Sequence, residues 1–393
     1  MAWNHPHLHF ARGAAALAAA MGIGRFVYTP ILPLMTAQAG LSPAAAGGLA
    51  TANYAGYLAG ALAGIAAPRT IRTTATWRAA IAAVVAGLAL MPLTHSVVAW
   101  LTIRTVAGFA SAVVFVIAVD WMLDHSRGRS AHLPGWGFGG VGVGIALSGL
   151  VVFALPAAGW QTAWWSSAAL AAAVGVPAWR MRGAAPPPVT ATAERTGSRR
   201  WFVVLLACYS LEGVGYIIAG TFLVAAIRQA TPGGLGNGAW VLVGVAAAPS
   251  AALWAMASAR WSRPSLLTAA LVMQAGGIAA PALFGGTAAA LIGAVLFGAT
   301  FIGVSGMALA AGRELAFPGA VAGLTAGYSV GQILGPVVVT PLLHQGFRPA
   351  LMVAAAVVTV SAGTAAWLRL SCRELSPPLR GAGRGQVATP RGR

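Results

Sequence analysis

The sequence contains few charged residues for its length. Only 8% of its 393 residues are charged and 58% are hydrophobic, which gives a mean hydropathy of +0.79. A soluble globular chain is about one quarter charged. The composition therefore excludes a soluble protein and indicates an integral membrane protein.

Acidic residues and cysteines are scarcer still, and lysine is absent, so all 24 basic residues are arginines against 6 acidic residues. The 2 cysteines, Cys208 and Cys372, provide neither a disulfide framework nor a metal-binding spacing. The histidines lie outside the long apolar runs and no credible Ser/His/Asp set is present. We therefore expect no catalytic residues, no metal site and no cofactor, and hence no enzyme.

What the chain does contain is a series of long apolar segments. Crossing a bilayer as a helix takes about 20 residues, and twelve segments approach or exceed that length. Short connections require neighbouring helices to run antiparallel. The expected fold is all-α, with twelve transmembrane helices. The segments are 14–38, 43–66, 76–94, 97–121, 136–157, 160–179, 201–226, 239–259, 265–284, 288–311, 319–342 and 349–370.

The distribution of arginine predicts the orientation, because cytoplasmic loops of membrane proteins are enriched in basic residues. Of the 24 arginines, 20 fall on one side of the predicted membrane, and only Arg228 and Arg348 fall on the other. Both termini are therefore expected to be cytoplasmic, in a bacterial inner membrane. The same bias accounts for the net charge of +18 without a nucleic-acid partner.

Two parts of the sequence repeat. Residues 213–223 align with 22–32 at an offset of 191, and residues 329–339 align with 142–152 at an offset of 187. Two parallel repeats of six spans are a known transporter architecture. We therefore predict two pseudo-symmetric six-helix bundles. The predicted division is a cytoplasmic N-terminus at 1–13, bundles at 14–179 and 201–370, a cytoplasmic linker at 180–200, and a basic disordered tail at 371–393.

The first predicted span carries Arg25 near its centre. A charge at that depth costs at least about 2.5 kcal/mol, and such residues usually face a water-filled cavity or a partner. Gly22 and Gly24 remove bulk beside the arginine, and Pro30 and Pro33 weaken the helix beyond it. We interpret this span as the first lining helix of a central cavity, where Arg25 would bind an anionic group.

The seventh predicted span carries Glu212, about 16 Å along the helix from Trp201. A lone carboxylate at that depth is expected to be protonated or paired, because removing its charge from water is costly. Three interpretations remain open. Glu212 is a proton carrier, a counter-ion to Arg25 when substrate is absent, or a neutral residue with a packing role.

The fourth predicted span carries Arg104 and Asp120. Arg104 lies roughly 10 Å inside the outer edge of the span. It either extends outward to water or faces the bundle interior as part of a gate or a proton relay. Asp120, near the cytoplasmic end, either pairs with a loop arginine or takes part in proton coupling.

Further polar side chains lie at the depth of the expected cavity. Each needs a hydrogen-bond partner in surroundings without water, so they either bind substrate or bond to one another. With Arg25 they form the predicted substrate-binding set, and Glu212, Arg104 and Asp120 form the predicted proton-coupling set. The substrate-binding set is Arg25, Tyr28, Asn53, Tyr57, Tyr216, Tyr328 and Gln332.

Several motifs carry a family resemblance. Residues 104–112, RTVAGFASA, resemble the fourth-span motif of the major facilitator superfamily. The segments GIGRFVYTPILPLM at 22–35, LATANYAGYLAGA at 49–61 and GQILGP at 331–336 are similar to its YbfB/YjiJ-type branch. The resemblance implies alternating access, with the motif arginine tied to proton coupling. Two departures stand out, since the second-to-third loop lacks the usual aspartate and the fifth span has no Gly-Pro pair.

These features together predict a secondary active transporter. We expect a proton-coupled, monomeric protein in the lipid membrane that moves a small molecule, an organic anion, by alternating access. One alternative is a proton-driven exporter of hydrophobic or cationic compounds, with Glu212 as the counter-ion of the ligand. An alternative of another class is a non-transporting receptor or assembly partner.

Overall fold

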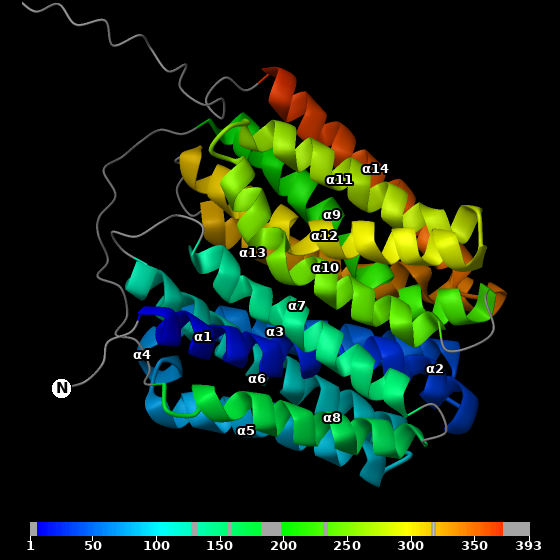
Figure 1. The fold of residues 1–393 in the computed structure, drawn as a ribbon. Helices are drawn as coiled ribbons and strands as arrows, with labels where there is room; N and C mark the ends of the chain where they lie inside the picture. Colours follow the sequence, from blue (N-terminus) through cyan, green and yellow to red (C-terminus); the bar gives the residue numbers. More distant parts are fainter. Residues whose placement is uncertain are drawn as a thin grey trace, which may run out of the picture.

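The computed structural model describes residues 6–126, 133–155, 159–181, 198–230, 235–315, 317 and 320–371. Within these residues the chain is all-helical (Figure 1), as the sequence predicts. The first half comprises α1 Pro6–Leu17, η1 Ala18–Ile23, α2 Tyr28–Gln38, α3 Pro43–Ala66, α4 Pro68–Ile71, α5 Thr74–Leu90, η2 Met91–Leu93, α6 Val97–Ser126, α7 Leu133–Ala154, α8 Trp160–Gly175 and η3 Val176–Ala178. The second half comprises α9 Arg199–Ala230, α10 Leu235–Ala257, α11 Arg263–Leu283, α12 Gly286–Glu314, α13 Ala320–Val339, η4 Thr340–Gln345 and α14 Arg348–Ser371.

Local signals in the sequence explain where several helices begin. The Ser42 hydroxyl accepts a hydrogen bond from the backbone N–H of Ala45 at 3.2 Å, and Pro43 occupies the first position of α3. Thr73 caps α5 in the same way, through the backbone N–H of Thr76 at 3.1 Å. These caps satisfy backbone donors that the first helical turn leaves free.

Ten helices within the described residues are long and apolar enough to cross a membrane. They are the first span, His9–Gln38, which joins α1, η1 and α2, together with α5, α6, α7 and α9 to α14. Of the other two predicted spans, α8 is only 16 residues long, and α3 carries Asn53, Tyr54 and Tyr57. The count of twelve spans and the side on which the termini lie stay predictions.

The helices form two groups that meet along a seam. Figure 1 shows α1 to α8 in one group and α9 to α14 in the other, with α7 and α10 side by side between them. A second contact across the seam joins α3 to α13. The division into bundles at 14–179 and 201–370 stays a prediction, and most of the predicted linker and tail lies outside the described residues.

The first span occupies the centre of this arrangement. In its most apolar window 94% of the residues are buried, against 39–67% for the other nine spans. Large apolar side chains are instead exposed on other helices, as with Val98 of α6 and Leu370 of α14, which suits contact with lipid. The buried first span therefore places Arg25 inside the protein rather than against lipid.

Candidate functional site

The first span is not a regular helix near Arg25. Residues Ala18–Ile23 form the π-helix η1, in which the backbone N–H of Gly24 donates to the carbonyl of Ala19 at 2.9 Å. A turn follows, and α2 begins at Tyr28. π-Helical turns are rare and occur frequently at functional sites. The irregular backbone places Arg25 at the junction between two helical segments.

Glycines allow neighbouring helices to approach this junction closely. A Cβ on Gly22 would lie 2.5 Å from the Cα of Gly144 in α7, and a Cβ on Gly24 would lie 2.5 Å from Cγ1 of Val84 in α5. Either added atom would force the neighbouring chain to move. The two glycines therefore hold the segment before Arg25 tightly against α7 and α5.

Arg25 is 3% exposed and lies at the seam between the two helix groups. Its Nη2 atom donates a 2.7 Å hydrogen bond to Oε1 of Gln332 in α13, while its Nε has no hydrogen-bond partner among the described residues. Its Cζ atom lies 4.2 Å from the ring centroid of Tyr57 and 4.8 Å from that of Tyr54. The guanidinium thus contacts aromatic faces and one amide, and it forms no ion pair with a described carboxylate.

Other hydrogen bonds join the two groups near this arginine. The hydroxyl of Thr29 donates to the carbonyl of Gly220 in α9. The hydroxyls of Tyr54 and Thr221 lie 3.0 Å apart, and the Thr221 hydroxyl in turn donates to its own helix. These polar contacts therefore join the first span and α3 of one group to α9 of the other group.

Arg104 faces the interior and does not extend outward. It is 2% exposed, and its guanidinium donates to the carbonyls of Gly24 and Arg25 at 3.4 and 3.2 Å. Its Cζ lies 5.1 Å from the ring centroid of Tyr28. These contacts satisfy carbonyl groups at the irregular turn, so Arg104 fixes the backbone that carries Arg25.

Asn53 and Tyr28 donate hydrogen bonds to backbone carbonyls near Arg25. The Asn53 amide donates to the carbonyl of Arg104 at 2.9 Å, and the Tyr28 hydroxyl donates to the carbonyl of Ala46 at 2.9 Å. Both side chains are buried. Of the predicted substrate-binding residues, these two contact the structure around Arg25, whereas Tyr57 and Gln332 contact Arg25 itself.

The second half contributes a row of nearly parallel aromatic rings. Tyr209 stacks on Tyr328 with centroids 4.3 Å apart, and Tyr328 lies 5.7 Å from Tyr216, both at an interplanar angle of 14°. The row continues from Tyr216 to Phe301 at 5.5 Å and 10°, and from Phe301 to Phe297 at 5.4 Å and 15°. We call these five residues the aromatic row.

The aromatic row reaches the surroundings of Arg25. Phe26, the residue after Arg25, packs edge-on against Phe301 with centroids 6.2 Å apart. Tyr216 lies beside Phe301, with ring centroids 5.5 Å apart. The predicted residues Tyr216 and Tyr328 therefore belong to one wall of the site, and Arg25 and Tyr57 belong to the opposite wall.

Glu212 does not pair with Arg25. It is fully buried, and its Oε1 accepts a 3.2 Å hydrogen bond from the side-chain amide of Gln274 in α11, while Oε2 has no partner among the described residues. On α9 it follows Tyr209 and precedes Tyr216 by about one helical turn each. The counter-ion interpretation is therefore wrong for this structure, in which Glu212 bonds to Gln274 instead.

Asp120 lies far from this cluster and forms an ion pair. Its Oδ2 accepts hydrogen bonds from Nη2 and Nε of Arg72 at 2.5 and 2.9 Å. In the second half Arg263 and Glu314 form a comparable pair between α11 and α12. The ion pair of Asp120 matches the loop-arginine interpretation. It connects α6 to Arg72 in the second-to-third loop, the loop that lacks the usual aspartate.

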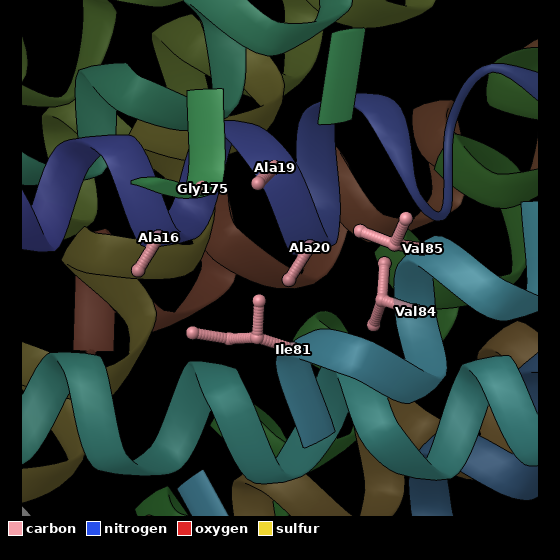
Figure 2. A pocket seen from close by; sticks show the side chains of 7 residues that line it. All are labelled: Ala16, Ala19, Ala20, Ile81, Val84, Val85 and Gly175. Atoms are coloured by element: carbon pink, nitrogen blue, oxygen red, sulfur yellow. The ribbon is translucent and has the colours of Figure 1, made fainter. Parts of the chain in front are cut away.

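A small apolar pocket lies beside η1 and apart from the site. Figure 2 shows its lining, which comes from the first span, α5 and α8. None of its residues is polar and none belongs to the predicted sets, so it does not suit an anionic ligand. The lining residues are Ala16, Ala19, Ala20, Ile81, Val84, Val85 and Gly175.

Sequence reasoning missed three residues of this region: Gln274, Tyr209 and Phe301. Gln274 is the only amide in its apolar span, and Tyr209 precedes Glu212 by one helical turn, so both carried a usable signal. Phe301 lies among many apolar residues and carried none. Among the described residues no group of three or more metal-ligating side chains occurs.

Comparisons with known proteins agree with this architecture. A family profile described as an uncharacterised MFS-type transporter, YbfB, matches residues 17–366. Two structures of the nucleoside transporter NupG, the first of a mutant, align with TM-scores of 0.66 and 0.62 at 13% and 14% identity. They cover 91% and 92% of this chain and 99% of their own.

At such identities the NupG structures show the fold and not the substrate. No curated protein matches the sequence significantly. The family profile spans most of the chain, from the first span to the last. The chain therefore belongs to the YbfB-type family of the major facilitator superfamily and is a multi-pass membrane transporter rather than an enzyme.

Proposed function

We propose that this transporter moves a small organic anion across a bacterial cytoplasmic membrane by alternating access, driven by coupled proton movement. It would act as a monomer, with its substrate site between the two helix groups. The observation that carries the proposal is the environment of Arg25, which is buried at the seam and has no carboxylate partner among the described residues.

The charge of Arg25 favours an anionic substrate. A buried cation that has only an amide and aromatic faces as neighbours is incompletely compensated. A carboxylate could displace the Gln332 contact and bind the guanidinium through two parallel hydrogen bonds. Because Gln332 belongs to the other half, binding an anion at Arg25 would also change the contact between the halves.

Glu212 is the proposed proton carrier. It is a fully buried carboxyl group with one oxygen that has no hydrogen-bond partner among the described residues. It lies on α9 within about one helical turn of Tyr209 and of Tyr216, two members of the aromatic row, which would link it to the substrate site. Protonation of Glu212 would then act on the wall that contains Tyr216 and Tyr328, although Glu212 itself would not touch the substrate.

The test is uptake of radiolabelled organic acids into proteoliposomes, with and without an imposed pH gradient. We expect at least one acid to accumulate, and Arg25→Ala to abolish uptake while the purified protein still unfolds cooperatively. Arg348→Ala is the matched control, since Arg348 is exposed and its loss should leave uptake intact. Full activity of Arg25→Ala would overturn the proposed role.

A further inference from the structure

The aromatic row differs from the other aromatic contacts near Arg25. Its four successive ring pairs have interplanar angles of 10–15°. By contrast, Tyr57 meets Phe115 at 60°, and Phe26 meets Phe301 at 71°. The ring planes of the row are therefore nearly parallel to one another.

Both walls of the site are aromatic around a single cation. On the first wall, the Cζ of Arg25 lies 4.2–5.4 Å from the ring centroids of Tyr57, Tyr54 and Phe26. On the second wall, Phe301 packs against Phe26, the neighbour of Arg25, and Tyr216 lies beside Phe301 with centroids 5.5 Å apart. All five of these rings are buried, so in this closed arrangement the two walls pack on one another.

Unsatisfied polar atoms accompany these rings. The Nε of Arg25 has no hydrogen-bond partner among the described residues, nor has the hydroxyl of Ser329, the neighbour of Tyr328. Both side chains are more than nine-tenths buried. The unpaired Nε of Arg25 is a buried donor that a polar ligand group could satisfy.

We propose that the transported anion is an aromatic carboxylate. The carboxylate would bind the guanidinium of Arg25, and the flat ring would stack on Tyr216 and Phe301 in the orientation of the aromatic row. Parallel offset stacking is a favourable arrangement for aromatic rings, and only a planar ligand can adopt it. This inference rests on the proposed organic-anion function and narrows its substrate class.

The first experiment compares matched probes with purified wild-type protein. Ligands that bind only the folded state raise its melting temperature, and at a fixed concentration the rise grows with the logarithm of the affinity. The probes are 3-phenylpropanoate, 3-cyclohexylpropanoate and 3-phenylpropanamide, which separate the contribution of ring planarity from that of charge. We expect 3-phenylpropanoate to bind at least about tenfold more tightly than either of the other two.

The second experiment tests the wall itself. Tyr216→Phe keeps the ring and should retain the preference for the phenyl probe, whereas Tyr216→Leu and Phe301→Leu remove a ring and should reduce that preference. Phe222→Leu is the matched control, because Phe222 stacks instead on Phe347, with centroids 5.8 Å apart. The ratio of the two carboxylate affinities is the readout, since general destabilisation affects both probes equally.

The outcomes separate this inference from the function on which it rests. If the cyclohexyl probe, or an aliphatic acid such as succinate, binds or is transported as well as the phenyl probe, the aromatic inference is overturned and the anion function stands. If no organic acid of either kind binds or is transported, the anion function itself is overturned. Loss of the phenyl preference in Phe222→Leu would also contradict the assignment of the wall.

Discussion

Arg25 of the first span donates a 2.7 Å hydrogen bond from Nη2 to Oε1 of Gln332 in α13, so one contact joins the buried cation to the opposite half of the transporter. An amide oxygen here occupies a position that an anionic substrate would take. Exchange of this contact for a ligand carboxylate offers a direct way to couple binding to movement of the halves.

Substitution Gln332→Glu should place a permanent anion on Arg25. We expect the melting temperature of the purified protein to rise, because a paired buried charge replaces an uncompensated one. The same carboxylate competes with substrate, so the KM for a transported anion should increase at least about tenfold. Gln332→Leu serves as control and should lower stability. An unchanged KM in Gln332→Glu would argue against anion binding at Arg25.

Substitution Glu212→Gln should separate proton coupling from substrate binding. Glutamine keeps the shape and the hydrogen bond with Gln274 but cannot release a proton. We expect accumulation driven by a pH gradient to disappear while counterflow exchange persists, both measured in proteoliposomes. Glu314→Gln, which removes the partner of Arg263, is the control. Normal pH-driven accumulation in Glu212→Gln would exclude the proton role.

Substitution Arg104→Lys should impair transport although the charge is retained. The guanidinium contacts two carbonyls, those of Gly24 and Arg25, and also lies over the ring of Tyr28. A lysine ammonium is a point charge that cannot reproduce this planar arrangement. We expect Vmax to fall about tenfold or more with a smaller change in KM, because the contacts of Arg104 position the backbone that carries Arg25. A wild-type Vmax would contradict this role.

Substitution Gly108→Ala should destabilise the protein, whereas Gly276→Ala should not. A Cβ on Gly108 would overlap the carbonyl oxygen of Asn53 in the adjacent α3, but a Cβ on Gly276 meets open space. We expect Gly108→Ala to reduce the free energy of unfolding by about 1–3 kcal/mol. Gly276→Ala should be neutral or raise it by about 0.5–1 kcal/mol. Denaturant unfolding in detergent measures both, and equal effects would refute the proposed close approach of α3 and α6.

Much of the fold and part of the site could be predicted from the sequence. Apolar segment length located the helices, because burial of backbone groups in lipid leaves few alternatives to a helix. Arg25 could be identified because a charged side chain in the membrane interior is energetically costly and therefore marks a functional position. Gly22 and Gly24 were correctly interpreted as removing bulk, although their contacts with α7 and α5 required the structure.

The partners of the buried polar residues could not be predicted. Position along a helix gives the depth of Glu212 but not the direction of its side chain, and Gln274 lies in a span 62 residues away. The same limit applies to the aromatic row, which collects rings from α9, α12 and α13. No pattern in the segment before Arg25 indicates π-helical winding, because that winding depends on how α5 and α7 pack against it.

The π-helical winding of η1 also has a rotational consequence. One residue more or less in a helical turn rotates everything that follows by about 100° around the axis. Because η1 ends directly before Arg25, relaxation to ordinary α-helical winding would swing the guanidinium to a different azimuth while α1 stayed where it is. The apolar pocket of Figure 2 borders Ala19 and Ala20 of η1, so a small space adjoins the segment whose winding would change.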